Sequence, residues 1–413
     1  MVVGLDIGTA KVCVVIGERN DRGILEITGV GVCPSTGIKK GVVVNIEATL
    51  RSVAAAVEAA EIMCGREVHS CWTGIGGSHI DGINSRGVVT VSGKVQETRE
   101  IGQEDLNRVL QLAQEVKITM DRQVLEVIPQ SFIVDGQEGI RNPLDMLGVR
   151  LEAEVHIITC SSTSAQNLVK CVNRAGFRVD DLILQSLAAG RSVLTDEEKE
   201  MGVALVDMGG GTTELLVYFD GAPCSTSSIP AGSELISRDI SIVKSISFEN
   251  AEKIKLDAGC CWESLLEGDE VLISGIGGRS TVSIGRKEIL EIVRPRVEEI
   301  YLMVREKLDK LALSRPLGAG IVLTGGGAML SGAAELASHI FRMPVRVGNP
   351  LPVPGLSEEY RSPQYATAIG LALVGNNRTS RGAGEGGGEI LIAGKGGAKR
   401  GIEKFVEWLK DFF

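Results

Sequence analysis

Residues 203–217 read VALVDMGGGTTELLV, in which an apolar stretch ends in Asp207 and a glycine and threonine turn leads into a second apolar stretch. Two apolar runs joined by so short a turn are typical of a β-hairpin. Because glycine and threonine carry no large side chain, backbone N–H groups and hydroxyls can approach phosphate oxygens at such a turn. The expected phosphate contacts are Gly209, Gly210, Gly211, Thr212 and Thr213.

A similar pattern begins the chain. The apolar stretch from Val2 to Ile7 is broken by Gly8 and Thr9 and resumes from Val12 to Ile16. A spacing of about 200 residues between two copies predicts two related halves. Asp6 and Asp207 end the two strands, and each is expected to hold Mg²⁺ through water, because this ion usually keeps most of its waters. The expected contacts of the first turn are Gly8, Thr9, Ala10 and Lys11.

A third glycine-rich segment, IVLTGGGAMLSG, occupies residues 321–332. A single turn of this kind is most often ordinary. Three of them in this order, in a chain without a GxxxxGK[ST] motif, predict a nucleotide site built differently from a P-loop. Small residues here would let a nucleoside lie against the backbone. The expected contacts are Gly325, Gly326, Gly327 and Met329.

Helical periodicity alternates with apolar strands along most of the chain, which predicts an α/β fold with mixed sheets. Residues 81–159 differ, because they combine short strands with one helix and contain no phosphate-type turn. We interpret them as an inserted α+β module. A formal GxGxxG at Gly382, Gly384 and Gly387 follows no strand and opens no helix, so it does not indicate a dinucleotide site. The helical segments are expected at 47–62, 103–116, 164–175, 251–256 and 286–311.

The net charge of the 413 residues is -10, which argues against nucleic acid as a partner. The nine cysteines form no CxxC pair, so they predict buried thiols in a reducing compartment rather than a zinc site or disulfides. The N-terminus lacks the features of a secretory signal. No apolar run approaches the roughly 20 residues that span a bilayer. We expect a cytoplasmic protein.

The end of the chain predicts an anchor. Residues 376–401 are rich in glycine and are expected to be a flexible linker. Residues 402–413 form an amphipathic helix that is too short to cross a membrane but suited to its interface. A helix packed on its own core is the alternative, which so long a linker disfavours. The apolar stripe consists of Ile402, Phe405, Val406, Trp408, Leu409, Phe412 and Phe413.

The three glycine motifs resemble those of the superfamily that contains actin, sugar kinases and heat-shock chaperone ATPases. Within it, the chain resembles the FtsA family of bacterial cell-division proteins over nearly all 413 residues, including SIPAGS at 228–233 and the terminal helix. The resemblance implies an α/β, two-lobed actin-like ATPase fold with duplicated ribonuclease-H-like cores and an inserted α+β module in the first lobe, of the SHS2-like type called subdomain 1C. It divides the chain into a first lobe core (1–80 and 160–193), the module (81–159), a second lobe core (194–236 and 310–375), an outer subdomain (237–309), the linker (376–401) and the terminal helix (402–413).

The resemblance also implies roles for single residues. Gly232 belongs to the nucleotide site, and Glu252 and Lys255 contact ribose and adenine, although a solvated ion pair on one helix face is the alternative. Gln185 lies in the segment whose actin counterpart positions water, which leaves slow ATP hydrolysis possible; a helix glutamine facing a neighbouring element is the alternative. Ala10 departs from the hydroxyl residue of many relatives, and Lys11 is expected to compensate in part.

The family resemblance implies an ATP-binding cytoskeletal adaptor that polymerises head to tail. It would bind the C-terminal tail of the tubulin-like protein FtsZ, later division proteins through residues 81–159, and lipid on the inner face of the cell membrane at the division site. Arginine pairs well with acidic tails, although solvated arginines on a helix face are the alternative. The arginines expected to bind the tail are Arg279, Arg286, Arg294 and Arg296.

Two other functions remain open at this point. One is a small-molecule kinase or polyphosphatase of the same superfamily, but a kinase needs a general base beside the substrate hydroxyl. The motifs offer no convincing extra carboxylate for that role, and the terminal helix would be unexplained. The other is a pilus-assembly relative that shares an inserted module, which the terminal helix disfavours.

Overall fold

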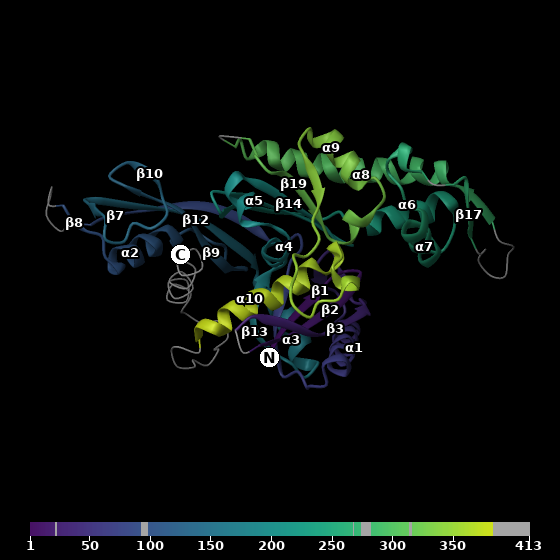
Figure 1. Ribbon diagram of the computed structural model, residues 1–413, viewed down its shortest axis with the longest axis horizontal. Coiled ribbons are helices and arrows are strands. Elements are labelled where there is room, and N and C mark those ends of the chain that lie inside the picture. The colour runs from purple at the N-terminus through teal and green to yellow at the C-terminus, as the bar shows by residue number, and fades with distance from the viewer. Residues whose placement is uncertain (21–22, 92–97, 267, 274–281, 314–315, 383–413) are drawn as a thin grey trace.

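Figure 1 shows the computed structural model of the chain, in which two sheets lie in separate lobes with helices between and around them. The structure describes residues 1–20, 23–91, 98–266, 268–273, 282–313 and 316–382.

The two lobes carry sheets of the same design. In each of these two sheets, three strands that follow one another in the sequence pair antiparallel. The first of the three also pairs in parallel with a fourth strand, and a fifth strand pairs in parallel with the fourth. The first sheet has the order β3 (Leu25–Pro34), β2 (Lys11–Arg19), β1 (Val2–Ile7), β6 (Ser70–Ile75) and β13 (Arg178–Leu184). The second has the order β16 (Ala222–Ile229), β15 (Thr213–Phe219), β14 (Val203–Met208), β19 (Gly320–Thr324) and β20 (Val345–Val347). This repeated order confirms the predicted duplication.

Helices cover both faces of the first sheet. On one face, α1 (Ile46–Cys64) and α3 (Ser162–Arg174) pack their apolar side chains on β1 and β2. The side chain of Asn45 accepts a hydrogen bond from the Ala48 amide at the start of α1, and Gly65 ends this helix with φ 71°. On the other face lie α4 (Gln185–Val193) and α10 (Ala366–Gly382). Every residue of β1 is buried because helices cover it on both sides.

The predicted boundary at the end of the second lobe is wrong, because helix α10 crosses it. Residues 310–375 were assigned to that lobe and 376–401 to a linker, but the helix continues to Gly382. Its buried residues pack on β1, β2 and β3 of the first lobe, and in Figure 1 it lies beside these strands. The approach is close, because a Cβ on Gly4 would lie 2.5 Å from the Ala368 carbonyl oxygen. Small residues obscure the apolar period of this helix, which explains why the sequence did not predict that it continues past residue 375.

The second sheet is likewise covered on both faces. Helices of the outer subdomain and α9 form one large core with β14, β15 and β19. On the opposite face, Ala189 and Val193 of α4 pack on Leu205, Leu216 and Val322. Helix α4 therefore contacts both sheets. The elements on the outer side are α6 (Glu234–Lys244), α7 (Phe248–Ala258), β17 (Glu270–Ile273), β18 (Val282–Gly285), α8 (Arg286–Lys310) and α9 (Ala333–Phe341). Shorter elements are β4 (Ile38–Lys39), β5 (Val42–Val43), α5 (Asp196–Met201), η1 (Glu263–Leu265), η3 (Gly326–Met329), η4 (Glu358–Tyr360) and η5 (Pro363–Tyr365).

The inserted module projects from the two lobes on the side away from α6, α7 and β17 (Figure 1). Its sheet has the order β10 (Gln137–Ile140), β9 (Arg122–Val134), β12 (Arg150–Ser161) and β7 (Asp81–Thr90). Helix α2 (Gln103–Gln114) packs on one face of this sheet through a core of its own. A short pair, β8 (Arg99–Glu100) and β11 (Leu147–Gly148), lies near its end. An α+β module is thus confirmed.

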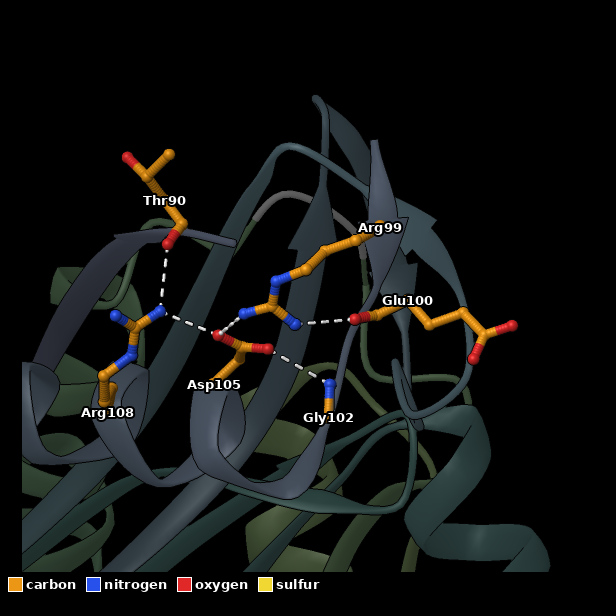
Figure 2. A network of polar contacts seen from close by, with 6 residues as sticks. All are labelled: Thr90, Arg99, Glu100, Gly102, Asp105 and Arg108. Carbon is orange, nitrogen blue, oxygen red and sulfur yellow. Dashed lines mark hydrogen bonds and ion pairs between the residues drawn. The ribbon is translucent and has the colours of Figure 1, made fainter. Parts of the chain in front are cut away.

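A polar network fixes the start of α2 (Figure 2). The buried carboxylate of Asp105 accepts hydrogen bonds from Arg99 and Arg108, both at 2.7 Å, and from the Gly102 amide at 3.1 Å. Arg108 also donates to the Thr90 carbonyl at 2.9 Å. One carboxylate therefore joins the first turn of α2 to β7 and β8.

The module also contacts the second lobe through β16. The Asn84 amide donates to the Cys224 carbonyl at 3.0 Å, and the Gln130 amide donates to the Pro223 carbonyl at 3.2 Å. Buried His156 lies 3.0 Å from the Thr226 hydroxyl. Burial lowers the pKa of His156 to about 4, so its ring is neutral at physiological pH.

We predict that Asp105→Ala loosens the start of α2, because it removes the acceptor of the Gly102 amide and leaves two arginines without their shared anion. Both arginines are about half exposed, so we expect a cost of about 2 kcal/mol. Hydrogen–deuterium exchange of the full chain should show faster exchange across the first turn of α2. Glu104→Ala, an exposed acid on the same turn, is the matched control. Equal exchange in both variants would contradict the prediction.

The same network has a pH dependence. Burial raises the pKa of Asp105, but hydrogen bonds from Arg99, Gly102 and Arg108 outweigh it and hold the pKa below 3.8. The stabilisation is therefore present above about pH 4 and is lost as the pH falls through the lowered pKa.

Candidate functional site

A cleft of about 990 Å³ lies between the lobes and is lined by both hairpin turns. The turns lie so close together that a larger residue would crowd the facing turn. A Cβ on Gly210 would lie 3.0 Å from the Ala10 Cβ, and one on Gly211 would lie 2.5 Å from the Thr9 hydroxyl oxygen. The residues that these turns and the strands before them contribute are Asp6, Gly8, Thr9, Ala10, Lys11, Asp207, Gly209, Gly210, Gly211 and Thr212.

The two turns share one backbone geometry. The Gly8 amide donates to the Lys11 carbonyl at 3.0 Å, and the Gly209 amide donates to the Thr212 carbonyl at 2.9 Å. The aspartate before each turn ends a central strand, which places the two carboxylates at the floor of the cleft. Small residues in both turns leave backbone amides accessible to an anion.

Five polar side chains gather at this floor. The Gln185 amide, at the start of α4, donates to Asp6 at 2.7 Å. The Thr367 hydroxyl donates to Asp207 at 3.3 Å. Glu214 accepts from the Gly77 amide at 2.9 Å through Oε1, whereas its buried Oε2 has no hydrogen-bond partner among the described residues. A buried carboxylate oxygen without a partner indicates a group that is satisfied by something outside the chain, such as water or a cation.

Burial shapes the charges of these acids. It raises the pKa of Asp6, against the opposing effects of Lys11 and Gln185. It raises the pKa of Asp207 to about 6, with a further increase from the neighbouring Asp6. It raises the pKa of Glu214 to about 8, again with a contribution from Asp207. A cation in the cleft would favour the ionised forms of all three.

Glu214 is the floor residue that the sequence patterns did not single out. It pairs with Asp207 across the second hairpin, and the first hairpin has Cys13 at the matching position. The sequence did contain a signal, an acid at the start of an otherwise apolar strand. Burying an unpaired carboxylate costs free energy, so an acid at such a position indicates a function. No group of three or more His, Cys, Asp or Glu side chains is arranged to hold a metal directly in the described ranges.

Lys11 points to the segment before α10. Its ammonium group donates to the Gln364 carbonyl at 2.5 Å and lies 4.9 Å from the centre of the Tyr365 ring. Burial lowers its pKa. Lys11 lines the cleft as expected from its position, and in this structure it also ties the first turn to η5.

The other end of the cleft is lined by α7 and the third glycine segment. Glu252 and Lys255 form an ion pair at 2.7 Å, and the Ser237 hydroxyl donates to Glu252. Gly325 has φ 81°, and a Cβ there would lie 2.2 Å from the Asp207 carboxylate. The third segment therefore abuts the second hairpin. The cleft residues from this end include Glu252, Lys255, Gly325, Gly326, Gly327 and Met329.

Two expected contact residues lie behind the cleft and not on its lining. Thr213 is fully buried, and its hydroxyl donates to the Ala231 carbonyl at 2.8 Å. A Cβ on Gly232 would lie 2.5 Å from the Gly210 carbonyl oxygen. Thr213 and Gly232 were expected to contact a ligand directly. In the structure they lie behind the second turn and support its backbone instead.

The three described arginines of the four expected to bind a partner do not form one surface. Arg286 lines the interlobe cleft. Arg294 pairs with Glu298 at 2.9 Å and lies over the Trp262 ring, 5.7 Å from its centre. Arg296 lies in a separate groove. Arg279 and the membrane stripe Ile402, Phe405, Val406, Trp408, Leu409, Phe412 and Phe413 lie outside the described residues.

The separate groove, of about 600 Å³, lies between α6 and α8. Arg296 makes two hydrogen bonds to Asp239, at 2.6 and 3.0 Å, and also pairs with Glu299. Ile242 and Val243 are 74% and 60% exposed, which leaves apolar surface beside these charges. The groove residues are Asp239, Ile242, Val243, Lys244, Glu288, Glu291, Ile292, Pro295, Arg296 and Glu299.

None of the helices in the described ranges has the length and apolar character needed to cross a membrane.

Comparison with solved structures agrees with this architecture. The PilM–PilN type IV pilus biogenesis complex gives a TM-score of 0.66 at 16% identity, covering 91% of this chain and 98% of that one. MreB5 of Spiroplasma citri bound to ADP gives 0.54 at 14% identity, covering 93% and 98%. These likenesses show the two-lobed actin-like ATPase fold.

Comparison with protein sequences is more specific. The family model described as "SHS2 domain inserted in FTSA" matches residues 77–159, and that described as "Cell division protein FtsA" matches residues 204–370. "Cell division protein FtsA" of Borreliella burgdorferi is 46% identical over 375 residues, which are 90% of this chain and 90% of that protein. The Pseudomonas aeruginosa protein of the same name is 43% identical, covering 92% and 91%. The Escherichia coli K12 protein is 40% identical, covering 93% and 92%. With duplicated hairpins, an inserted SHS2 module and identities of this size over nine-tenths of its length, the chain belongs to the FtsA family of cell-division proteins.

Proposed function

We propose that this chain binds ATP with Mg²⁺ in the interlobe cleft and, in that state, polymerises head to tail and tethers FtsZ filaments to the inner face of the cell membrane during division. The observation that carries the nucleotide part is the pair of glycine turns facing each other above Asp6, Asp207 and Glu214, of which Asp6 and Glu214 are buried. MreB5 of Spiroplasma citri, which shares the fold, has been solved bound to ADP and to AMPPNP.

In this proposal the two turns bind phosphate oxygens through backbone amides and the hydroxyls of Thr9 and Thr212. The third glycine segment, Glu252 and Lys255 bind the nucleoside. A bound Mg²⁺ would supply positive charge between the phosphates and the floor, held through water by Asp6 and Asp207. The orphan oxygen of Glu214 and the raised pKa values fit a cation at this place, because both are relieved when positive charge is present.

Gln185 is the proposed water-positioning residue. Its amide nitrogen is already engaged by Asp6, and a Cβ on Gly76 would lie 2.0 Å from its Oε1. The side chain is therefore held at the floor of the cleft by its neighbours. We propose at most slow hydrolysis, with ATP acting mainly to set the relation between the lobes.

The groove between α6 and α8 is the proposed binding site of the FtsZ tail. Exposed Ile242 and Val243 offer apolar contacts, and Arg296 and Lys244 offer cations. Both cations are paired with acids of the groove, so tail carboxylates would compete with Asp239 and Glu288 for them. Pro295 cannot donate a backbone hydrogen bond, so the Glu291 carbonyl lacks its usual partner four residues on in α8.

The membrane part of the proposal rests on the amphipathic pattern of residues 402–413. A helix of this kind binds reversibly in the membrane interface. Later division proteins are proposed to bind the module, residues 81–159. In this arrangement the protein acts on the cytoplasmic side of the membrane at the division site.

We predict that Glu214→Gln removes a pH-dependent loss of stability in the chain without nucleotide and divalent cation. A carboxyl whose pKa rises from 4.5 to about 8 on folding resists ionisation, so folding stability falls as the pH rises from about 4.5 to 8. At pH 8 the thermal midpoint of the variant should exceed that of the wild type by about 5 °C. Thermal unfolding from pH 5 to 9 measures this. Identical pH profiles would show that Glu214 does not carry the effect.

The tethering function predicts that the full chain brings FtsZ filaments to liposomes only with ATP and Mg²⁺. A chain ending at Gly382 keeps α10 and should stay in the supernatant. Trp408→Glu in the full chain should also lose binding, because burying its charge in the interface is costly. Co-sedimentation with anionic liposomes measures all three. Equal pelleting of the full and shortened chains would remove the membrane role.

Binding of the FtsZ tail is predicted to weaken at least tenfold in Arg296→Glu, since the new acid lies beside Asp239 and Glu299 and repels tail carboxylates. Ile242→Ser should weaken binding with little effect on the fold, because this side chain is mostly exposed. Arg305→Glu, on α8 outside the groove, is the matched control. Fluorescence anisotropy of a labelled tail peptide gives the affinities, and an unchanged affinity in the first two variants would place the tail elsewhere.

A further inference from the structure

The cleft and the groove share two helices. Helix α6 begins at the cleft, where Ser233, Glu234 and Ile236 are among the lining residues, and it ends in the groove at Ile242, Val243 and Lys244. Helix α8 begins at the cleft with Arg286, and its next turns line the groove from Glu288 to Glu299. Ten residues separate Arg286 from Arg296, or about 15 Å of helix.

The two helices are held together as a unit. Across the groove, Lys244 pairs with Glu288, and Arg296 makes its double hydrogen bond to Asp239. Beneath the groove, buried side chains of both helices meet in one core. These core residues include Ile236 and Ile240 of α6 and Ile289 and Val293 of α8. A shift at the start of either helix is therefore carried along its length to the groove.

Helix α7 belongs to the same unit. The Ser237 hydroxyl of α6 donates to Glu252, and Lys255 donates to the Ser233 carbonyl at 3.4 Å. Glu252 and Lys255 line the cleft. The side chains proposed to contact the nucleoside are thus bonded to the helix whose far end forms the groove.

Arg286 is the cleft residue of α8, and its bonding is incomplete. Its Nε is buried and has no hydrogen-bond partner among the described residues. The lining of the cleft also includes the apolar residues Phe248, Leu256, Leu265 and Leu266. A guanidinium in such a setting can stack on a nucleobase and donate hydrogen bonds to a nucleoside. A buried donor without a partner gains most from a ligand that supplies an acceptor.

We propose that Arg286 binds the nucleoside part of the nucleotide and that α6 and α8 thereby make nucleotide binding in the cleft and tail binding in the groove mutually dependent. This inference rests on the proposed function of both sites. Linkage requires that each ligand change the affinity of the other by the same factor, commonly about five-fold or more for coupled sites.

The test uses the full chain, a fluorescent ATP analogue, inorganic triphosphate as competitor and the FtsZ tail peptide. Arg286→Met keeps most of the side-chain volume and removes the charge. Lys287→Met makes the same change at the next position, where the side chain is 71% exposed. We expect Arg286→Met to weaken binding of the ATP analogue about tenfold without changing competition by triphosphate, and Lys287→Met to change neither by more than about twofold.

The coupling is measured in the same titrations. In the wild type, saturating tail peptide should change the affinity for the ATP analogue about five-fold, and saturating ATP should change tail affinity by the same factor. In Arg286→Met both changes should fall below about twofold, with the tail still bound. Thermal midpoints within about 2 °C of the wild type would confirm that the variants are folded.

Each other outcome has one meaning. Wild-type affinity in Arg286→Met, an equal loss in Lys287→Met, or an equal loss of triphosphate competition would overturn the role of Arg286. Two ligands that bind the wild type without affecting each other would overturn the coupling and leave the proposed function standing. Failure of the wild type to bind the ATP analogue would instead refute the proposed function.

Discussion

The contact between the two glycine turns is the constraint on which the rest of the structure depends. A side chain at Gly210 would crowd Ala10, and one at Gly211 would displace the Thr9 hydroxyl and crowd the Lys40 backbone. Each turn directly follows the central strand of its own sheet, β1 or β14, and both turns line the cleft between the lobes. Asp6, Asp207 and Glu214 lie beneath the turns, and burial raises the pKa of each. The accessible turn amides and the carboxyl groups with raised pKa values therefore lie at the same end of the cleft.

Small residues also permit the close packing of α10 on α4. A Cβ on Gly370 of α10 would lie 1.8 Å from the Ala188 carbonyl oxygen of α4. Helix α4 contacts both sheets, and its first residue, Gln185, reaches the floor of the cleft. The excess of glycine in the composition, 52 of 413 residues, thus reflects helix and strand contacts as well as turns.

Much of this architecture could be predicted from the sequence, because its signals are local. The hairpins around Asp6 and Asp207 and the period of α1, α3 and α8 follow from neighbouring residues alone. Glu214 had a local signal, an acid in an otherwise apolar strand, but its place beside Asp207 follows from strand pairing. Other features depend on contacts farther along the chain, since Thr213 donates to Ala231 and Gly232 packs on Gly210 behind the turn. Helix α10 was assigned to the wrong lobe because its small residues carry no clear apolar period and its partners lie at the other end of the chain. Arg286 was grouped with Arg296 because both lie in the segment expected to bind the tail, although α8 carries the two residues to different sites.

The position of α10 has a mechanical consequence. This helix packs on the first sheet, so a force applied to the chain at residue 382 is borne by the first lobe. A partner in the groove instead loads α6 and α8, which belong to the core of the second lobe. If the proposed tether holds the chain at these two points, tension acts across the cleft and is resisted by the contacts between the turns, by α4 and by any ligand that joins the lobes. In that proposal the strength of the tether is set by what the cleft holds.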